Sequence, residues 1–199
     1  KSVHIALLYA LESLPVNTDP YVIDGHADKR KTFKSIILRL VNSENLASFK
    51  ANITRSGNVP VQQAFKTYTN KRQQYEYLRA LGLKATEPSK PLSIKKGFIN
   101  YIPSGATGDE LLTLVMDRHH LIAHYFGTKN IGLKLQRLDS DLMANTLDKL
   151  KGIPCLPVHD SIRCKVSDME RVSNAMIDSF RELHGQEIMV TNDLFDKKG

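Results

Sequence analysis

The chain has 199 residues, of which 41% are hydrophobic and 25% are charged, so a folded protein with a buried core is expected. It contains no run of about 18 apolar residues, so we expect neither a membrane-spanning helix nor a membrane partner. The net charge of +7 and the isoelectric point near 9.4 make nucleic acid an expected partner, with a merely basic soluble protein as the equal alternative.

The first residue is Lys1 rather than Met, and an apolar stretch follows over residues 3–14. This stretch contains His4 and Glu12 and lacks a small-residue cleavage site, so we interpret it as folded protein rather than as a signal sequence. We expect the natural start of the protein to lie upstream, and we expect the stretch itself to be a strand that runs into a helix. Residues 15–20 are predicted to form a turn.

Helices are predicted over residues 28–50 and about 61–81, with a loop at 53–60. Asp28 is the expected N-cap of the first helix, whose opening turns are basic where the helix dipole favours acids. The second helix mixes aromatic and cationic residues, namely Phe65, Tyr68, Tyr75, Tyr77, Lys66, Lys71, Arg72 and Arg79. Such a mixture suits base stacking and phosphate contacts, although it more often marks an amphipathic helix with a solvated basic face.

A loop rich in Pro, Ser and Lys is predicted at 84–97, followed by a helix at 108–126. His119, His120 and His124 have a spacing that a metal site can use. The sequence places no further acid or cysteine beside them, so surface or packing histidines are the favoured interpretation.

The clearest helix is predicted at 133–150, where leucines recur on one face and Gly152 ends the pattern. Residues 153–158 and 161–166 are predicted to be two strands joined by a two-residue turn, His159 and Asp160.

Beyond the hairpin, Ser167 and Glu170 are expected to form a capping box that opens a helix, and a short strand is expected at 185–195. Cys155 and Cys164 flank the turn, and we expect them to be reduced thiols of an intracellular protein.

Asp160 at the tip of such a hairpin is well placed to bind a divalent metal ion. A single carboxylate binds Mg²⁺ weakly, so a second acid or substrate phosphates must share the ion. The alternative is an aspartate that merely suits a turn.

The order of these elements resembles the palm and fingers of family A polymerases, which include the bacterial-type DNA polymerases and the phage single-subunit RNA polymerases. Their third catalytic motif is a hairpin with His-Asp at its tip, matched by His159 and Asp160, and Ser161 stands where the RNA enzymes often have Ser. The resemblance covers nearly the whole chain. It implies an α+β fold with a polymerase-like palm, which has an antiparallel sheet, and a helical fingers subdomain.

The resemblance further implies palm at 1–27, with the tail of the first catalytic motif, and helical fingers at 28–130. Palm would resume at 131–199, with the catalytic hairpin, a C-terminal helix and a strand. The catalytic Asp of the first motif would lie two residues before Lys1, and His4 would replace the Glu that selects against ribose.

Residues 30–42 resemble the second motif, which implies that Arg30 and Lys34 contact the triphosphate and that Asn42 stands beside the nucleotide where aromatic residues are common. Gln136 matches a glutamine that touches the primer-template, with Arg137 in place of the following Gly. The further residues expected to bind nucleic acid are Ser161, Lys71 and Arg72.

The implied function is that of a template-directed nucleotidyltransferase segment, a DNA or RNA polymerase that uses two Mg²⁺ ions. Nucleoside triphosphates and primer-template or promoter DNA would be its partners. Asp160 would be a catalytic metal ligand, and His159 would contact the primer backbone. An upstream segment or a partner chain would supply the second catalytic Asp, so the segment alone is expected to be inactive.

We expect a cytoplasmic protein, including the case of a viral protein in the host cytoplasm. One alternative is a nucleic-acid-binding module with a polymerase-like palm and no catalysis. A basic α+β protein with a coincidental His-Asp turn ranks below both.

Overall fold

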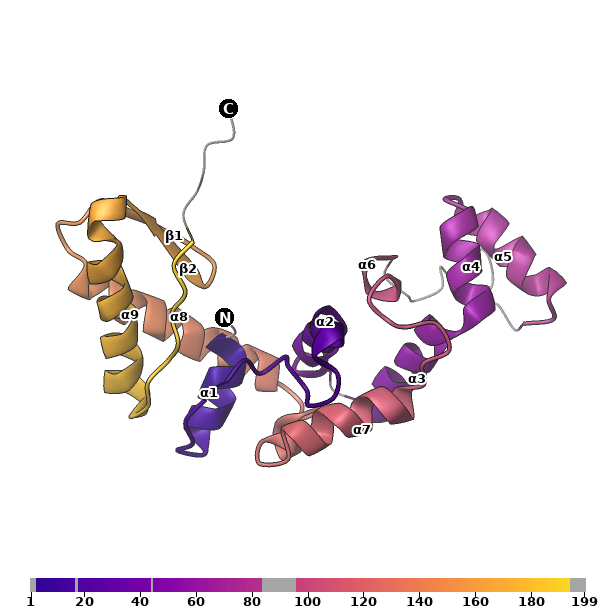
Figure 1. Ribbon diagram of the computed structural model, residues 1–199, viewed down its shortest axis with the longest axis horizontal. Coiled ribbons are helices and arrows are strands. Elements are labelled where there is room, and N and C mark those ends of the chain that lie inside the picture. The colour runs from indigo at the N-terminus through magenta and orange to yellow at the C-terminus, as the bar shows by residue number, and fades with distance from the viewer. Residues whose placement is uncertain (1–2, 17, 44, 84–95, 194–199) are drawn as a thin grey trace. The chain divides into compact units, whose positions relative to one another are not determined.

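The computed structural model describes residues 3–16, 18–43, 45–83 and 96–193, which form two compact units. The hairpin unit consists of Lys1–Pro20 and Asn130–Gly199, and the helical unit consists of Tyr21–Lys129. Figure 1 shows the helices and strands of both. The loop predicted at 84–97 lies almost entirely outside the described residues. Among the described helices, none combines the length and the apolar character needed to span a bilayer.

In the hairpin unit, α8 packs against both α1 and α9. The elements of this unit are α1 (Val3–Leu11), α8 (Ile131–Lys149), β1 (Cys155–Val158), β2 (Ser161–Cys164), the 3-10 turn η3 (Val166–Asp168) and α9 (Met169–His184). The segment predicted as a strand that runs into a helix is helical from Val3 onward. Its consecutive residues Ile5 to Leu8 are all buried, because α8 and α9 cover more than one side of it.

The predicted hairpin is confirmed as a two-stranded antiparallel sheet, with Val158 opposite Ser161 and Cys155 opposite Cys164. The two residues between the strands form the turn. One face of the hairpin packs on a small core cluster in which Leu150 of the loop after α8 meets α9. The members of this cluster are Leu150, Val172 and Ala175, with Ile153, Cys155, Ile162, Cys164 and Met176 packed against them.

The helical unit consists of α2 (Arg30–Leu40), α3 (Leu46–Gly57), α4 (Val59–Thr67), α5 (Lys71–Ala80), α6 (Lys96–Ile99) and α7 (Gly108–Arg118), with the 3-10 turns η1 (Ala27–Lys29) and η2 (Ala123–Tyr125). The helices α3 and α7 approach so closely at Gly108 that a Cβ atom there would clash with the carbonyl oxygen of Lys50. Thr107 and Glu110 form a capping box at the start of α7.

Several predicted helix boundaries in this unit are wrong. The helix expected at 28–50 is two helices, since the side chain of Asn45 accepts a hydrogen bond from the backbone N–H of Ser48 and begins α3. The loop expected at 53–60 falls largely within the last turns of α3. The helix expected at 61–81 is interrupted, because Asn70 caps α5 in the same way.

Other local expectations also fail. Asp28 lies in η1 rather than at an N-cap, and α7 ends at Arg118, short of the expected end at 126. The capping box of Ser167 and Glu170 does not form, because η3 precedes α9 and Asp168 occupies the N-cap without a side-chain bond. Residues 185–193 contain no strand, and the rest of the segment expected as a strand lies outside the described residues.

Candidate functional site

The turn between β1 and β2 presents His159 and Asp160, whose side chains are both exposed. The hydroxyl of Ser161 donates a hydrogen bond to the carbonyl oxygen of Val158, 2.8 Å away, and so closes the turn on itself. The backbone of His159 has φ of +54°, in the left-handed region that side chains with a Cβ atom avoid. Backbone strain of this kind is concentrated at functional sites, so it motivates a functional hypothesis for this turn.

We expect His159→Gly to raise the free energy of unfolding by about 0.5–1 kcal/mol, because glycine enters the left-handed region without a Cβ clash. Urea denaturation measures this change. The matched control is His159→Ala, which also removes the imidazole but keeps the Cβ atom, so it should bring no gain. An equal gain from both variants would assign the effect to the imidazole instead of the backbone.

Asp160 borders a cavity of about 220 Å³ inside the hairpin unit. Residues from α8, β2 and α9 line it, together with the segment that follows α9. The lining is largely apolar and includes several methionines, while Asp139, Asp160 and Asp193 supply carboxylates. A carboxylate beside apolar walls is less well solvated than one on an open surface, so its interactions with other charges are stronger.

Asp139 of α8 is the residue that sequence reasoning missed. Its side chain is 27% exposed, and its Oδ2 atom lies 3.8 Å from Nε2 of His4 on α1. Burial raises the pKa of Asp139, His4 opposes that rise, and the Asp160 carboxylate adds to it. The two carboxylates therefore lie close enough to interact, although they come from different elements.

A signal for Asp139 was present in the sequence. It lies four residues after Leu135 and three before Leu142, so it belongs to the apolar stripe of α8, which is buried at both of these leucines. An acid within such a stripe conflicts with the pattern around it, and conflicts of this kind tend to mark functional sites.

Asp139 and Asp160 come from separate elements, and both have carboxylate oxygens, the ligand atoms that hard divalent cations bind. In the described ranges, no cluster of three or more His, Cys, Asp or Glu residues could hold a metal. Any further ligand oxygens would therefore come from outside this pair. The three histidines considered as a metal site lie in different environments. His119 is buried edge-on against Phe126, whereas His120 and His124 are exposed.

In the helical unit, the cations of Arg30 and Lys34 lie over one aromatic ring. Their charged groups are 5.4 Å and 5.7 Å from the ring centroid of Tyr21, which is fully buried. A cation over an aromatic face is held by the ring quadrupole, so Tyr21 fixes the direction of both side chains. Asn42 lies just beyond α2, where its amide donates a hydrogen bond to the carbonyl oxygen of Leu38 at 2.8 Å.

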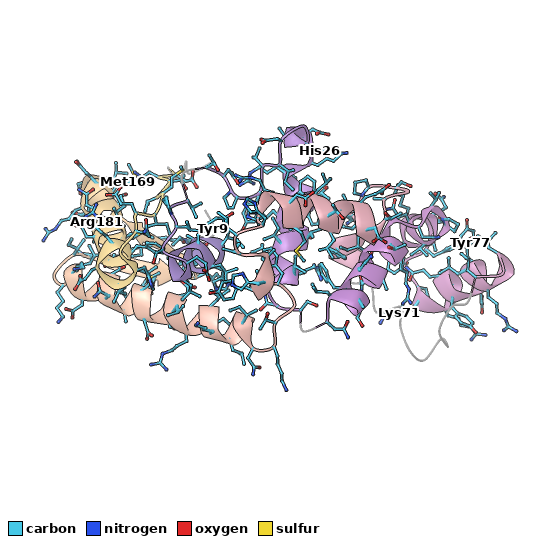
Figure 2. All side chains as sticks on the ribbon, turned by 90° about the horizontal axis from the view of Figure 1, so that it is seen from below. Tyr9, His26, Lys71, Tyr77, Met169 and Arg181 are labelled. Atoms are coloured by element: carbon cyan, nitrogen blue, oxygen red, sulfur yellow. The ribbon has the colours of Figure 1, made fainter. Side chains whose placement is uncertain are left out.

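The cations of α5 are exposed, whereas its aromatic residues are partly used for packing. Lys71 and Arg72 begin the helix, and Nε of Arg72 donates a hydrogen bond to Glu76 at 2.9 Å. Tyr77 packs against the core cluster formed by Val61, Ala64, Leu78 and Ile99, and against Tyr68 at 5.6 Å between ring centroids. Lys71 and Tyr77 can be followed in Figure 2. Phosphate contact by the cations therefore fits this helix better than base stacking by Tyr77.

On α8, Gln136 and Arg137 are exposed. Nε of Arg137 donates to both carboxylate oxygens of Asp141, each 3.1 Å away, so its charge is largely balanced within the helix. Gln136 and Arg137 thus lie on the solvent side of the helix, whereas Asp139 lies on its partly buried side.

The positive charge of the chain is concentrated in the helical unit. Residues 21–129 hold 17 of the 28 Lys and Arg residues and 8 of the 21 Asp and Glu residues, a net charge of +9. The rest of the chain holds the other 11 basic and 13 acidic residues, a net charge of −2. The attraction for a polyanion therefore comes from the helical unit.

Comparison with protein-family models, with curated proteins and with solved structures finds no match to this chain.

Proposed function

We propose that the chain is the palm and fingers segment of a template-directed nucleotidyltransferase that transfers nucleotides from nucleoside triphosphates to a growing nucleic acid with two divalent metal ions. The observation that supports this most is the exposed carboxylate of Asp160 at the hairpin tip, with Asp139 beside the same cavity. The Asp160 carboxylate also contributes to the raised pKa of Asp139, which indicates that the two acids lie near each other.

Within this chain, Asp160 and Asp139 are the residues that would hold magnesium, since both offer the carboxylate oxygens that this ion prefers. An upstream segment or a partner chain would supply the further catalytic Asp. Bound magnesium would neutralise the negative charge that accumulates during phosphoryl transfer. The protein's own contribution is to fix the two carboxylates on β1–β2 and α8. His159 is exposed next to Asp160, and in this proposal it would contact a nucleic-acid backbone.

Phosphate recognition falls to the helical unit in this proposal. Arg30 and Lys34 are one helical turn apart on α2, and charge-assisted hydrogen bonds from two such cations suit a triphosphate. The net charge of +9 on residues 21–129 suits a nucleic-acid backbone, with binding that weakens steeply as salt rises.

We expect Tyr21→Leu to weaken nucleoside triphosphate binding by about two- to fivefold, because a cation over an aromatic ring gains roughly 0.5–1 kcal/mol. Tyr21→Phe keeps the ring and should leave the affinity close to that of the natural protein. Fluorescence titration with a labelled triphosphate measures both. Equal losses in the two variants would show that the hydroxyl, and not the ring, supports Arg30 and Lys34.

The proposal is tested by primer extension with the intact protein, Mg²⁺ and either ribonucleotides or deoxyribonucleotides. The expected result is templated addition with at least one of the two sugars. Salt-sensitive binding of the primer-template without any addition would instead support a nucleic-acid-binding module, which the charge of the helical unit also favours.

A further inference from the structure

The chain has two cysteines, and the hairpin brings them face to face. Cys155 of β1 and Cys164 of β2 are direct partners in the antiparallel register, and both are free thiols. They lie at the base of the hairpin whose turn presents His159 and Asp160. The proposed function makes no use of this pair.

The register also determines what kind of pair they form. In a hairpin with a two-residue turn, the residues flanking the turn exchange hydrogen bonds, and bonded and non-bonded pairs then alternate along the ladder. Val158 and Ser161 flank the turn, so Pro157 and Ile162 form a non-bonded pair, which suits a proline because it has no N–H to donate. Two positions further on, Cys155 and Cys164 are again a non-bonded pair.

Non-bonded pairs are the ones in which side chains lie closest. Their Cα atoms are about 4.5 Å apart, within the range of roughly 4.4–6.8 Å that disulfides span. Both cysteines are half-buried and pack against the same core cluster, so both side chains lie on one face of the hairpin. The spacing of such a pair is therefore compatible with a bond between them.

The surroundings of Cys164 govern how a reagent reaches the pair. Cys164 borders two cavities, of about 220 Å³ and about 320 Å³, and Arg163, Lys165 and Asp193 line the second of these with it. A small reagent can therefore approach Cys164 from either cavity. Burial chiefly raises the pKa of Cys164, with smaller contributions from Asp168 and from the Cys155 thiol, so a smaller fraction of Cys164 is thiolate at neutral pH.

We propose that Cys155 and Cys164 are a site of reversible oxidation that forms a cross-strand disulfide by exchange with a small disulfide such as oxidised glutathione. One cysteine thiolate attacks a sulfur of the reagent, forming a mixed disulfide and releasing one reagent thiol. The other cysteine thiolate attacks the protein sulfur of that mixed disulfide and releases the second. Two cysteine thiols are oxidised and one reagent disulfide is reduced to two thiols.

The bond changes the stability of the hairpin. A two-stranded hairpin is marginally stable by itself, and this bond would close the base from which the turn projects. A disulfide stabilises mainly by restricting the unfolded chain, so we expect the melting temperature of the oxidised protein to be higher by roughly 4–10 °C.

The test is to incubate the full chain with oxidised glutathione under native conditions and to measure its intact mass. The expected product has lost two hydrogen atoms, has gained no glutathione and yields a cross-linked peptide pair on non-reducing digestion. With Cys164→Ser, the expected product is a single mixed disulfide at Cys155. A natural chain that keeps glutathione on either cysteine, or that forms only intermolecular dimers, would overturn the proposal.

A matched control moves one thiol to the opposite face of the hairpin. Leu156 is 59% exposed and lies opposite Arg163, so Cys155→Leu combined with Leu156→Cys preserves composition while separating the two sulfurs. We expect intramolecular closure of this variant to be at least about tenfold slower, because successive strand residues point to opposite faces. Closure at the natural rate would show that register does not govern the reaction and would also overturn the proposal.

Discussion

Asp160→Asn is expected to lower nucleotide incorporation by at least about 10²–10³-fold, the loss typical when one group that stabilises transition-state charge is removed. Asparagine has nearly the same shape but no charge, so the variant loses a metal-binding carboxylate without creating a cavity. Because Asp160 is exposed at a turn, the free energy of unfolding should change by no more than about 0.5 kcal/mol. Single-turnover primer extension with Mg²⁺ measures incorporation, and fluorescence anisotropy measures binding of the primer-template, which should persist.

The control for this variant is Asp178→Asn. Asp178 is an exposed aspartate of α9 whose carboxylate accepts a hydrogen bond from Arg181 at 2.7 Å. It should keep full incorporation. Normal incorporation by Asp160→Asn would end the catalytic assignment. Loss of nucleic-acid binding together with incorporation would assign Asp160 to binding instead.

The hairpin could be predicted because everything that specifies it is local. Its second strand alternates exposed and half-buried residues, its first strand has half-buried residues at both ends, and a two-residue turn joins them, so composition and turn length suffice. The antiparallel sheet of the expected α+β fold follows from the same segment. The left-handed backbone at His159 was not predicted, although two-residue hairpin turns favour positive φ at their first residue and histidine enters that region more often than most residues with a Cβ atom.

Three of the wrong helix boundaries in the helical unit have the same physical reason. A new helix is capped in each case by an asparagine, namely Asn45, Asn58 or Asn70. Hydrophobic spacing predicted a single helix around Asn45 and around Asn70, and a loop around Asn58. Asparagine competes for backbone hydrogen bonds and so ends one helix and begins the next. Spacing alone cannot detect this, since the apolar stripes on either side keep the same period.

The carboxylate pair depends on tertiary structure. His4, Asp139 and Asp160 are far apart in the sequence, and α1 had to be recognised as a helix packed on α8 before His4 could be placed near Asp139. The run of apolar residues in α1 gave no such indication, because a buried helix and a buried strand look alike over a short apolar stretch. Helical spacing placed Asp139 in the stripe, but only the fold places Asp160 close enough to affect it.

We expect Asp139→Asn to stabilise the protein at neutral pH while impairing the proposed reaction. The pKa of Asp139 is raised above the ordinary value of 3.8, chiefly by burial, so the folded state binds its proton more tightly than the unfolded state does. Stability therefore falls as the pH rises from about 3.8 through the folded-state pKa, and the ionised carboxylate is destabilising at all higher pH. Asparagine removes this penalty, by up to about 0.5 kcal/mol for a partly exposed site.

The same substitution removes one of the two carboxylates proposed to hold magnesium. Incorporation should fall by about 10- to 100-fold, and half-maximal activity should require more Mg²⁺, as when a group supporting a metal site is lost. Urea denaturation at neutral pH and at a pH below 3.8 separates the two effects, because the stability gain should vanish where Asp139 is already protonated.

Asp148→Asn is the matched control on the same helix, since Asp148 is exposed and paired with Lys151 at 2.5 Å. Hydrogen bonding to Lys151 lowers the pKa of Asp148, so the sign reverses: its ionised form stabilises the fold at neutral pH, and that contribution is lost as the pH falls through the folded-state pKa. Asp148→Asn should therefore be slightly less stable and fully active. If Asp139→Asn stabilises the protein but leaves the Mg²⁺ requirement unchanged, Asp139 is not a magnesium ligand. Replacing a residue that binds the ion should change both the stability and the activity.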